Sequence, residues 1–420
     1  MTARQKRALV LAGGFPQRAL LQELRRRGYE TLLADYLEHP VAEKDADHVF
    51  RVSTLDVPAI QSLAATWDVA FLITACTDQA LLTVARVSEE LGLPSYLDAE
   101  TALRVTNKTY MKDVFRTHGI PTASFVTADH WTLEAFERLA FPVVVKPADA
   151  NSSKGVVTAA SLAELAEAFA DAQAISRTSS VIVEEFLSGM EITVDAYVER
   201  GEAQVLAVSR VDKIPESGRF IIYRSVFPAP ISAAAQTRVQ SIVQAIAEAF
   251  HLQDTPLLVQ MLVEGDHVNV VEFSARTGGG TKHLFLRRAA GFDAIAAVID
   301  LTIGRHPHIE PQPPAANFMA EEYLYARTGT LCQFAGVESL LSTGAMAEFY
   351  CFVREGMALD GRVQSSGDRV AGFRIEAASA TELAQKHETV MRRLQFLDPQ
   401  GRDLLRRNLI EPLDAEAVPS

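Results

Sequence analysis

Short apolar runs alternate with longer amphipathic segments over the first hundred residues. Residues 78–91 repeat apolar positions at helical spacing, and Gly92-Leu93-Pro94 follows them in the order typical of a helix end. Buried strands are expected at 7–12, 31–35 and 69–74. Because strands separated by helices of this length build parallel sheets, the pattern predicts a doubly wound α/β domain over residues 1–100.

The pattern changes near residue 100. A helical stretch over 99–118 ends at Gly119-Ile120-Pro121, and a helix is expected over 162–174. Alternating apolar and polar positions predict further strands at 141–147, 181–187, 191–198, 205–211, 257–263 and 268–273. Four prolines between residues 307 and 314 indicate a boundary, and a mixed α+β segment follows it.

The doubly wound pattern raises the question of a dinucleotide site. That fingerprint needs G-x-G-x-x-G after the first strand, whereas this chain has only Gly13-Gly14 followed by Phe15-Pro16. Asp35 ends the second strand, where a ribose-binding acid would lie, but one acid at a strand end is more often a turn cap. The sequence therefore argues against a nicotinamide cofactor.

Composition limits the class of protein further. The 420 residues carry 40 Lys+Arg against 53 Asp+Glu, a net charge of −13, which argues against nucleic acid as a partner. No apolar run approaches the roughly 18 residues of a membrane span. The three cysteines are too far apart for a disulfide framework or a metal cluster. These features predict a cytoplasmic enzyme with no membrane partner.

Two lysines are the first candidates for chemistry. Lys108 lies in the predicted helix over 99–118, and Lys146 ends an apolar strand immediately before Pro147. A lysine at such a strand end buries its stem and directs its ammonium group beyond the strand. Taken alone, Lys108 is typical of a solvated surface lysine, and Lys146 could equally lie at the end of a surface strand.

A polar loop follows the second lysine. Small hydroxyl side chains, a lysine and a glycine at 151–155 would let backbone N–H groups close around phosphate oxygens. The loop is not a Walker A motif, because G-x-x-x-x-G-K-[ST] is absent. Taken alone, it is also compatible with an ordinary turn.

The predicted hairpin near residue 266 holds the remaining candidates. Glu272 on one strand and Gln260 on its partner are oxygen donors of the kind that Mg²⁺ accepts when it shares substrate phosphates. Arg276 precedes the glycine run 278–280, a place where an oxyanion could rest. A hairpin with a structural salt bridge is the alternative.

Five features resemble the ATP-grasp superfamily over residues 1–300 by their order along the chain: a lysine on a helix, a lysine at a strand end, the polar loop, the acidic strand at 181–187 and the carboxylate hairpin. The resemblance is closest to the carboxylate–amine ligases and, within them, to the L-amino-acid (dipeptide) ligases. It implies a doubly wound domain over 1–100, an ATP-grasp domain of two α+β subdomains over 101–304 with a flexible lid at about 113–184, and a C-terminal α+β domain over 305–420.

The resemblance also implies roles for individual residues. Lys108 and Lys146 would contact the ATP phosphates, Glu191 would hold the ribose hydroxyls, and Arg276 would steady the acyl phosphate and the tetrahedral intermediate. Gln260 and Glu272 would bind Mg²⁺. The flap over the phosphates would include Asn151, Ser152, Ser153 and Gly155, and the adenine hinge would be Glu184, Glu185, Phe186 and Leu187.

The chain departs from the family pattern at two metal positions. Gln260 stands where many members have glutamate, and the usual E-x-N reads Glu272-Phe273-Ser274. One firm carboxylate therefore remains for two metal ions, which puts the second ion in doubt.

The resemblance implies an ADP-forming ligase that activates a carboxylate as an acyl phosphate and joins it to an amine, with ATP and Mg²⁺ (or Mn²⁺) as cofactors. We expect a homodimer that joins amino acids into a dipeptide or an amino-acid amide. Candidate substrate contacts are Lys213, Arg224, Gly279 and His283, of which His283 is expected on a helix surface. A bicarbonate-using carboxylating ligase and an ATP-binding regulator without turnover remain alternatives.

Overall fold

The computed structural model describes residues 5–150, 154–214 and 220–414. It begins with a four-stranded parallel sheet in the order β3-β2-β1-β4. The strands are β1 (Arg7–Leu11), β2 (Glu30–Asp35), β3 (His48–Arg51) and β4 (Phe71–Ile73), and the intervening helices are α1 (Phe15–Arg26), α2 (Val57–Trp67) and α3 (Asp78–Leu91). Alternate residues of β1 enter two different hydrophobic clusters, Val10 in one and Leu9 in the other. Both faces of the sheet are thus covered, which confirms the predicted doubly wound fold.

Asp35 shows why this domain lacks a ribose-binding acid. Its carboxylate accepts hydrogen bonds from the backbone N–H groups of Gly13 (2.7 Å) and Leu37 (2.8 Å). Asp35 therefore caps the turn after the first strand, which is the structural role expected for it from the sequence.

Two helices lead out of the first domain. The expected single helix over 99–118 is divided into α4 (Ala99–Thr106) and α5 (Lys108–His118). Asn107 separates them, because its side chain accepts hydrogen bonds from the N–H groups of Thr109 and Tyr110 and so caps α5. Lys108 is consequently the first residue of a helix.

A small antiparallel sheet follows, in the order β5-β8-β6-β7. It comprises β5 (Phe125–Ala128), β6 (Val143–Pro147), β7 (Val157–Ala159) and β8 (Val181–Glu185), together with α6 (Leu133–Phe136) and α7 (Leu162–Ile175). Valines of β6 and β8 pack against Phe136, Leu165 and Phe169 of the two helices. This packing leaves the other face of the sheet, with Lys146, for the rest of the molecule.

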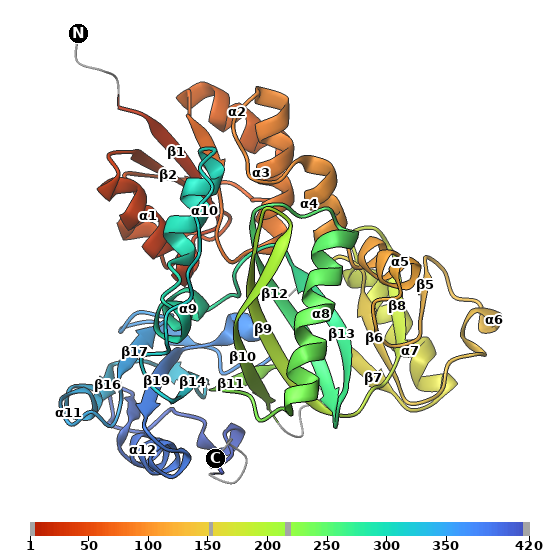
Figure 1. Ribbon diagram of the computed structural model, residues 1–420. Helices are drawn as coiled ribbons and strands as arrows, with labels where there is room; N and C mark the ends of the chain where they lie inside the picture. Colours follow the sequence, from red (N-terminus) through yellow and green to blue (C-terminus); the bar gives the residue numbers. More distant parts are fainter. Residues whose placement is uncertain (1–4, 151–153, 215–219, 415–420) are drawn as a thin grey trace.

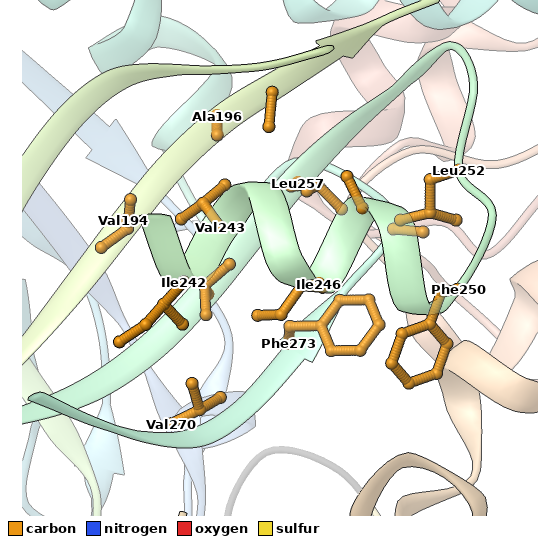
Figure 2. Close-up of a cluster of buried hydrophobic side chains, with 14 of the residues drawn as sticks. Val194, Ala196, Ile242, Val243, Ile246, Phe250, Leu252, Leu257, Val270 and Phe273 are labelled. Atoms are coloured by element: carbon orange, nitrogen blue, oxygen red, sulfur yellow. The ribbon is translucent and has the colours of Figure 1, made fainter. Parts of the chain in front are cut away.

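The largest element is an eight-stranded antiparallel sheet in the order β13-β12-β9-β10-β11-β14-β19-β17. Its strands are β9 (Met190–Glu199), β10 (Glu202–Lys213), β11 (Ile222–Phe227), β12 (Thr255–Glu264), β13 (His267–Ser274), β14 (Phe318–Leu324), β17 (Glu348–Cys351) and β19 (Ala371–Ala377). Figure 2 shows how α8 (Ala233–Ala249) packs on it, with Val243 and Ile246 directed toward Val194, Leu257 and Phe273. Apolar residues at alternate positions of β12 and β13 point to one face of the sheet and form the core that holds these strands in place.

The chain returns twice to earlier parts of the molecule. After α9 (Lys282–Ala290), helix α10 (Ala294–Thr302) packs beside α1 on the first domain (Figure 1), and Ile295, Val298 and Ile299 join its core. Strand β14 then pairs with β11, so the large sheet continues across the boundary predicted at 304. The remaining elements are β15 (Gly329–Thr330), β16 (Gln333–Ala335), α11 (Val337–Ser342), β18 (Ala358–Leu359), α12 (Ala380–Arg393) and β20 (Gln395–Leu397). Within the described residues, no helix has the length and apolar character needed to cross a membrane.

Candidate active site

A cavity of about 550 Å³ lies where the three parts of the chain meet. The first domain contributes the start of α1 and the Cys76–Gln79 segment, and the large sheet contributes β12, β13 and the glycine run. The C-terminal part contributes Tyr323, Phe352 and Arg369. Lys108, Gln260, Glu272, Arg276 and Gly279, all expected from the sequence, line this one cavity.

Lys108 is held at the N-terminus of α5. Its Nζ donates to the carbonyl of Ala150 (2.8 Å) and lies 3.3 Å from Oε2 of Glu272. The contact to Ala150 ties the lysine to the chain just before the predicted phosphate loop. Asn151, Ser152 and Ser153 of that loop lie outside the described residues. Gly155 has φ +74°, and a Cβ there would lie 2.7 Å from Ile175, so the loop's end requires glycine.

Lys146 belongs to a buried group of three charges. Glu184, at 5% exposure, lies 2.7 Å from Nζ of Lys146 and 2.6 Å from Nζ of Lys112. Burial opposes ionisation of Glu184, but the two lysines outweigh it and lower the pKa of its carboxyl. Burial also lowers the pKa of Lys112 to about 8. Sequence reasoning overlooked Lys112, although its place four residues after Lys108 on α5 is the spacing of one helix face.

The segment predicted as an adenine hinge begins at this group. The Glu184 side chain points to the two lysines, and the carboxylate of Glu185 accepts from the N–H of Ala140 (2.9 Å). The N–H of Phe186 donates to Pro142 (3.0 Å), and the Phe186 ring is 42% exposed. Glu191, at the start of β9, is paired with Lys213 and accepts from Nε2 of Gln260 (3.4 Å). The hinge and ribose roles remain predictions.

Gln260 and Glu272 face each other across β12 and β13, in register in the sheet. Burial disfavours the charged carboxylate, but Lys108 and Lys146 outweigh it and lower the pKa of Glu272. Glu272 is therefore an anion beside an amide oxygen, a donor set that suits Mg²⁺ shared with phosphate oxygens. No cluster of three or more His, Cys, Asp or Glu side chains that could hold a metal occurs within residues 5–150, 154–214 and 220–414.

Arg276 is oriented by a residue that sequence reasoning missed. Its Nε donates to Oδ1 of Asp78 (2.7 Å), its Nη2 pairs with Oδ2 of the same carboxylate, and its Nη1 donates to the carbonyl of Thr277 (2.8 Å). Burial works against the charged guanidinium, but Asp78 raises the pKa of Arg276. Asp78 is the first residue of α3, where an acid is usually a helix-end residue, so no local signal marked it.

Lys213, Arg224 and His283 are predicted substrate contacts, but in the structure each is paired or buried. Lys213 is paired with Glu191 and lies 4.6 Å from the centroid of the Phe220 ring. Arg224 is 2% exposed, is not among the residues lining the cavity, and donates to Glu322 (2.5 Å) and the carbonyl of Glu411 (2.6 Å). The expectation that His283 lies on a helix surface is wrong, because this second residue of α9 is only 2% exposed. Phe220, Ile221 and Ile222 line the cavity.

Comparison with known proteins agrees with this architecture. Residues 139–283 match the family model of the ATP-grasp domain. The chain is 23% identical to an L-arginine-specific L-amino acid ligase of Bacillus subtilis over 346 residues, 78% of this chain and 82% of that protein. It is 26% identical to a phosphoribosylamine–glycine ligase of Lactococcus lactis over 216 residues, 49% of this chain and about half (52%) of that protein.

The fold comparison extends over nearly the whole chain. The crystal structure of an L-amino acid ligase from Bacillus licheniformis superimposes with a TM-score of 0.76 at 18% identity, covering 94% of this chain and 98% of that one. Residues 139–283 therefore carry an ATP-grasp domain, and the chain shares its overall fold with a solved L-amino acid ligase.

Proposed function

We propose that the protein is an ATP-dependent, ADP-forming ligase that joins the carboxylate of one amino acid to the amine of another. The observation that carries this proposal is the meeting of Lys108, the Gln260–Glu272 pair and Arg276 in one cavity of about 550 Å³. The named activity of the B. subtilis relative, whose length the chain covers to 82%, supports the substrate class.

The chemistry explains why such an inventory of charges is useful. A carboxylate does not react with an amine at neutral pH, because its oxygen is a poor leaving group. Phosphoryl transfer from ATP gives an acyl phosphate, from which the amine can displace phosphate. This transfer depends on positioning and charge neutralisation rather than on covalent catalysis by the protein.

The chain's own residues divide this work between them. Lys108 and Lys146 would neutralise ATP phosphates, and both now lie beside carboxylates that a phosphate could replace. Glu272 and Gln260 would hold Mg²⁺, which supplies charge neutralisation at the transferred phosphoryl group. Arg276, kept in one orientation by two bonds to Asp78, would offer a fixed cation to the developing oxyanion.

A screen of amino-acid pairs tests the proposal. ADP release is measured with MgATP and each pair, and the products are identified by mass spectrometry. A condensed dipeptide from at least one pair is expected. Product that forms only with bicarbonate would instead identify a carboxylating ligase, and tight ATP binding with no turnover on any pair would identify the regulator suggested by Gln260 and Ser274.

Glu272→Gln tests the metal assignment within that screen. The variant keeps the size of the side chain but removes the anion, so turnover should fall by about 10²–10³ while the melting temperature changes little. Glu264→Gln, an exposed change at the end of the partner strand β12, is the matched control. Full activity of Glu272→Gln would show that this carboxylate does not hold the metal.

A further inference from the structure

Four cationic side chains line the cavity, and three of them are neutralised by neighbouring carboxylates. Lys108 lies 3.3 Å from Glu272, Nζ of Lys282 lies 3.1 Å from Asp195, and Arg276 is paired with Asp78. The fourth is Arg369. In the part of the chain that the structure describes, no carboxylate lies within ion-pair distance of its guanidinium group.

Arg369 is held in place although its hydrogen-bonding capacity is not fully used within the described residues. Its guanidinium carbon lies 3.6 Å from the centroid of the Tyr323 ring, and Nη2 donates to the carbonyl of Ile222 (3.1 Å). A guanidinium group carries five N–H donors, and the bond to Ile222 uses one of them. A cation–aromatic contact fixes the orientation of the group. Tyr325 also interacts with it, and Nε is buried with no hydrogen-bond partner among the described residues. The Nη N–H groups that do not donate to Ile222 are therefore held in a defined direction.

Arg369 lies against the glycine run. A Cβ built on Gly280 would lie 3.2 Å from Nη1 of Arg369 and 2.9 Å from the hydroxyl oxygen of Tyr323. Gly280 also has φ +64°, which favours glycine. The lack of a side chain at this position therefore leaves room for Arg369 beside the loop that begins with Arg276.

The wall next to Arg369 is aromatic. The Phe15 ring, at the start of α1, lies 5.3 Å from the Phe352 ring, which lies 6.2 Å from the Tyr323 ring (centroid distances). Phe15, Phe352 and Tyr323 all line the cavity, and Val353 adds to the same wall. An apolar surface beside an uncompensated cation suits a ligand with an anionic end and an apolar body.

We propose that Arg369 binds a carboxylate of one of the two substrates and that Phe15 and Phe352 pack against the apolar side chain of the same molecule. The inference rests on the proposed function and adds the residue that selects the substrate. A carboxylate is favoured over a phosphate monoester, because a doubly charged group is typically surrounded by more than one free cation.

The carboxylate held by Arg369 is the one that is not activated. An arginine fork stabilises the anion through charge-assisted hydrogen bonds, and a stabilised anion is a weaker nucleophile toward phosphorus. The arginine therefore suits the substrate that contributes its amine and keeps its carboxylate. Arg276, beside Ser274 and Glu272, remains the cation of the reacting centre.

The test compares an amino acid with its amide as the amine substrate. With wild-type protein, L-leucine should have a KM well below that of L-leucinamide, which lacks the carboxylate. Arg369→Met should raise the KM for leucine about 10- to 100-fold, leave the KM for leucinamide and for ATP within about twofold, and so remove the preference. Arg369→Lys, which keeps the charge but loses the fork, should be intermediate. Arg362→Met, an exposed arginine in the same part of the chain, is the matched control.

Other results would overturn the proposal. An equal loss for leucine and leucinamide in Arg369→Met would mean that the residue acts on structure alone, and an amine bearing a phosphate that outcompetes leucine would replace the carboxylate by phosphate. Phe352→Ala should raise the KM for leucine more than the KM for glycine, and equal effects would remove the aromatic wall from the model of binding.

Failure of the proposed function can be recognised separately. If no amino-acid pair is turned over, calorimetric titration of L-leucine into the wild-type protein and into Arg369→Met, with a non-hydrolysable ATP analogue present, still measures the contact. If leucine binds at least tenfold more weakly to Arg369→Met, the carboxylate site is supported even though the ligase activity is not. Equal binding, or none to either protein, contradicts it.

Discussion

Arg276 keeps its orientation in the cavity through a carboxylate that lies 198 positions away in the chain. Asp78 accepts from two nitrogens of the guanidinium group, and the exposed fraction of each side chain is 14%. Removing one member of a buried ion pair leaves the other charged group without compensation, which costs about 3–5 kcal/mol. The pair therefore connects the stability of the protein with the orientation of the cation that is proposed to act at the reacting centre.

Asp78→Asn is expected to reduce both properties. The free energy of unfolding, measured in urea, should fall by roughly 3–5 kcal/mol, and turnover should fall because Arg276 is no longer fixed. The double variant Asp78→Asn/Arg276→Met should recover part of the stability but none of the activity. Asp113→Asn, which removes an exposed ion pair with Arg116, is the control, and an equal effect of both single variants would contradict the assignment.

The buried His283 side chain is expected to make the stability of the protein depend on pH. Burial, assisted by Arg287, lowers the pKa of this side chain to about 4 from its ordinary value of 6.5. Below pH 6.5 the unfolded chain takes up a proton that the folded protein does not, so stability is lost as the pH falls from 6.5 toward 4. The loss approaches about 3 kcal/mol at its lower end.

The prediction is checked with His283→Gln, which cannot titrate. Its unfolding free energy should vary less between pH 6.5 and pH 4 than that of the wild-type protein. His130→Gln, at an exposed histidine, should retain the wild-type slope. An unchanged slope in His283→Gln would show that other groups dominate the acid transition.

At the scale of elements, helix α5 and strands β6 and β8 together build the part of the site that is proposed to bind the ATP phosphates. α5 presents Lys108 and Lys112 one turn apart, β6 presents Lys146, and β8 supplies Glu184 between the two deeper lysines. The antiparallel pairing of β6 with β8 sets this arrangement, because it aligns Lys146 with Ile182, two positions before Glu184. A substitution of one of these charged residues therefore alters the electrostatic environment of the residues on the other two elements.

Lys146→Met should weaken ATP binding about 10- to 100-fold while leaving the KM for the amino acids nearly unchanged, because one charge-assisted contact to phosphate is lost. ATP affinity is measured by calorimetry and the KM values by ADP release. Lys44→Met, at an exposed lysine, is the control. Equal effects on ATP and amino acids would indicate that Lys146 supports the whole cavity instead.

At the scale of the whole molecule, the three parts share sheets, cores and the cavity. Strand β14 extends the large sheet beyond β11, α10 completes the core of the first domain, and Arg27 of that domain lies 2.6 Å from Asp300. Arg224 on β11 is bonded to Glu322 on β14, across the predicted boundary at 304. The parts are therefore expected to fold together.

Truncation after Gly304 should consequently prevent cooperative folding. The shortened chain would expose the edge of β11 and deprive Arg224 of Glu322, so it should aggregate or melt without a transition. Cleavage at a protease site placed in the exposed connector 310–314 is the matched control, and its two fragments should stay together on size exclusion. A soluble 1–304 fragment with a sharp melting transition would contradict this view.

The sequence by itself determined the elements and much of the cavity lining. Apolar periodicity marks strands and helices locally, and positions at strand ends or before glycine runs mark polar groups that open beyond a sheet. For this reason Lys108, Gln260, Glu272 and Arg276 could be singled out before the fold was known, and the structure brings them into one cavity.

Only the tertiary structure decided which charges neutralise each other. The pairing of Asp78 with Arg276, the pairing of Glu322 with Arg224, and the contact of Arg369 with Ile222 join residues about 100 to 200 positions apart, for which local patterns carry no signal. The burial of His283 likewise depends on Phe15, which α1 brings from the first domain. A charge has the same chemistry wherever it stands in the sequence, but its pKa, its orientation and its freedom to bind a ligand are set by the partners that folding places beside it.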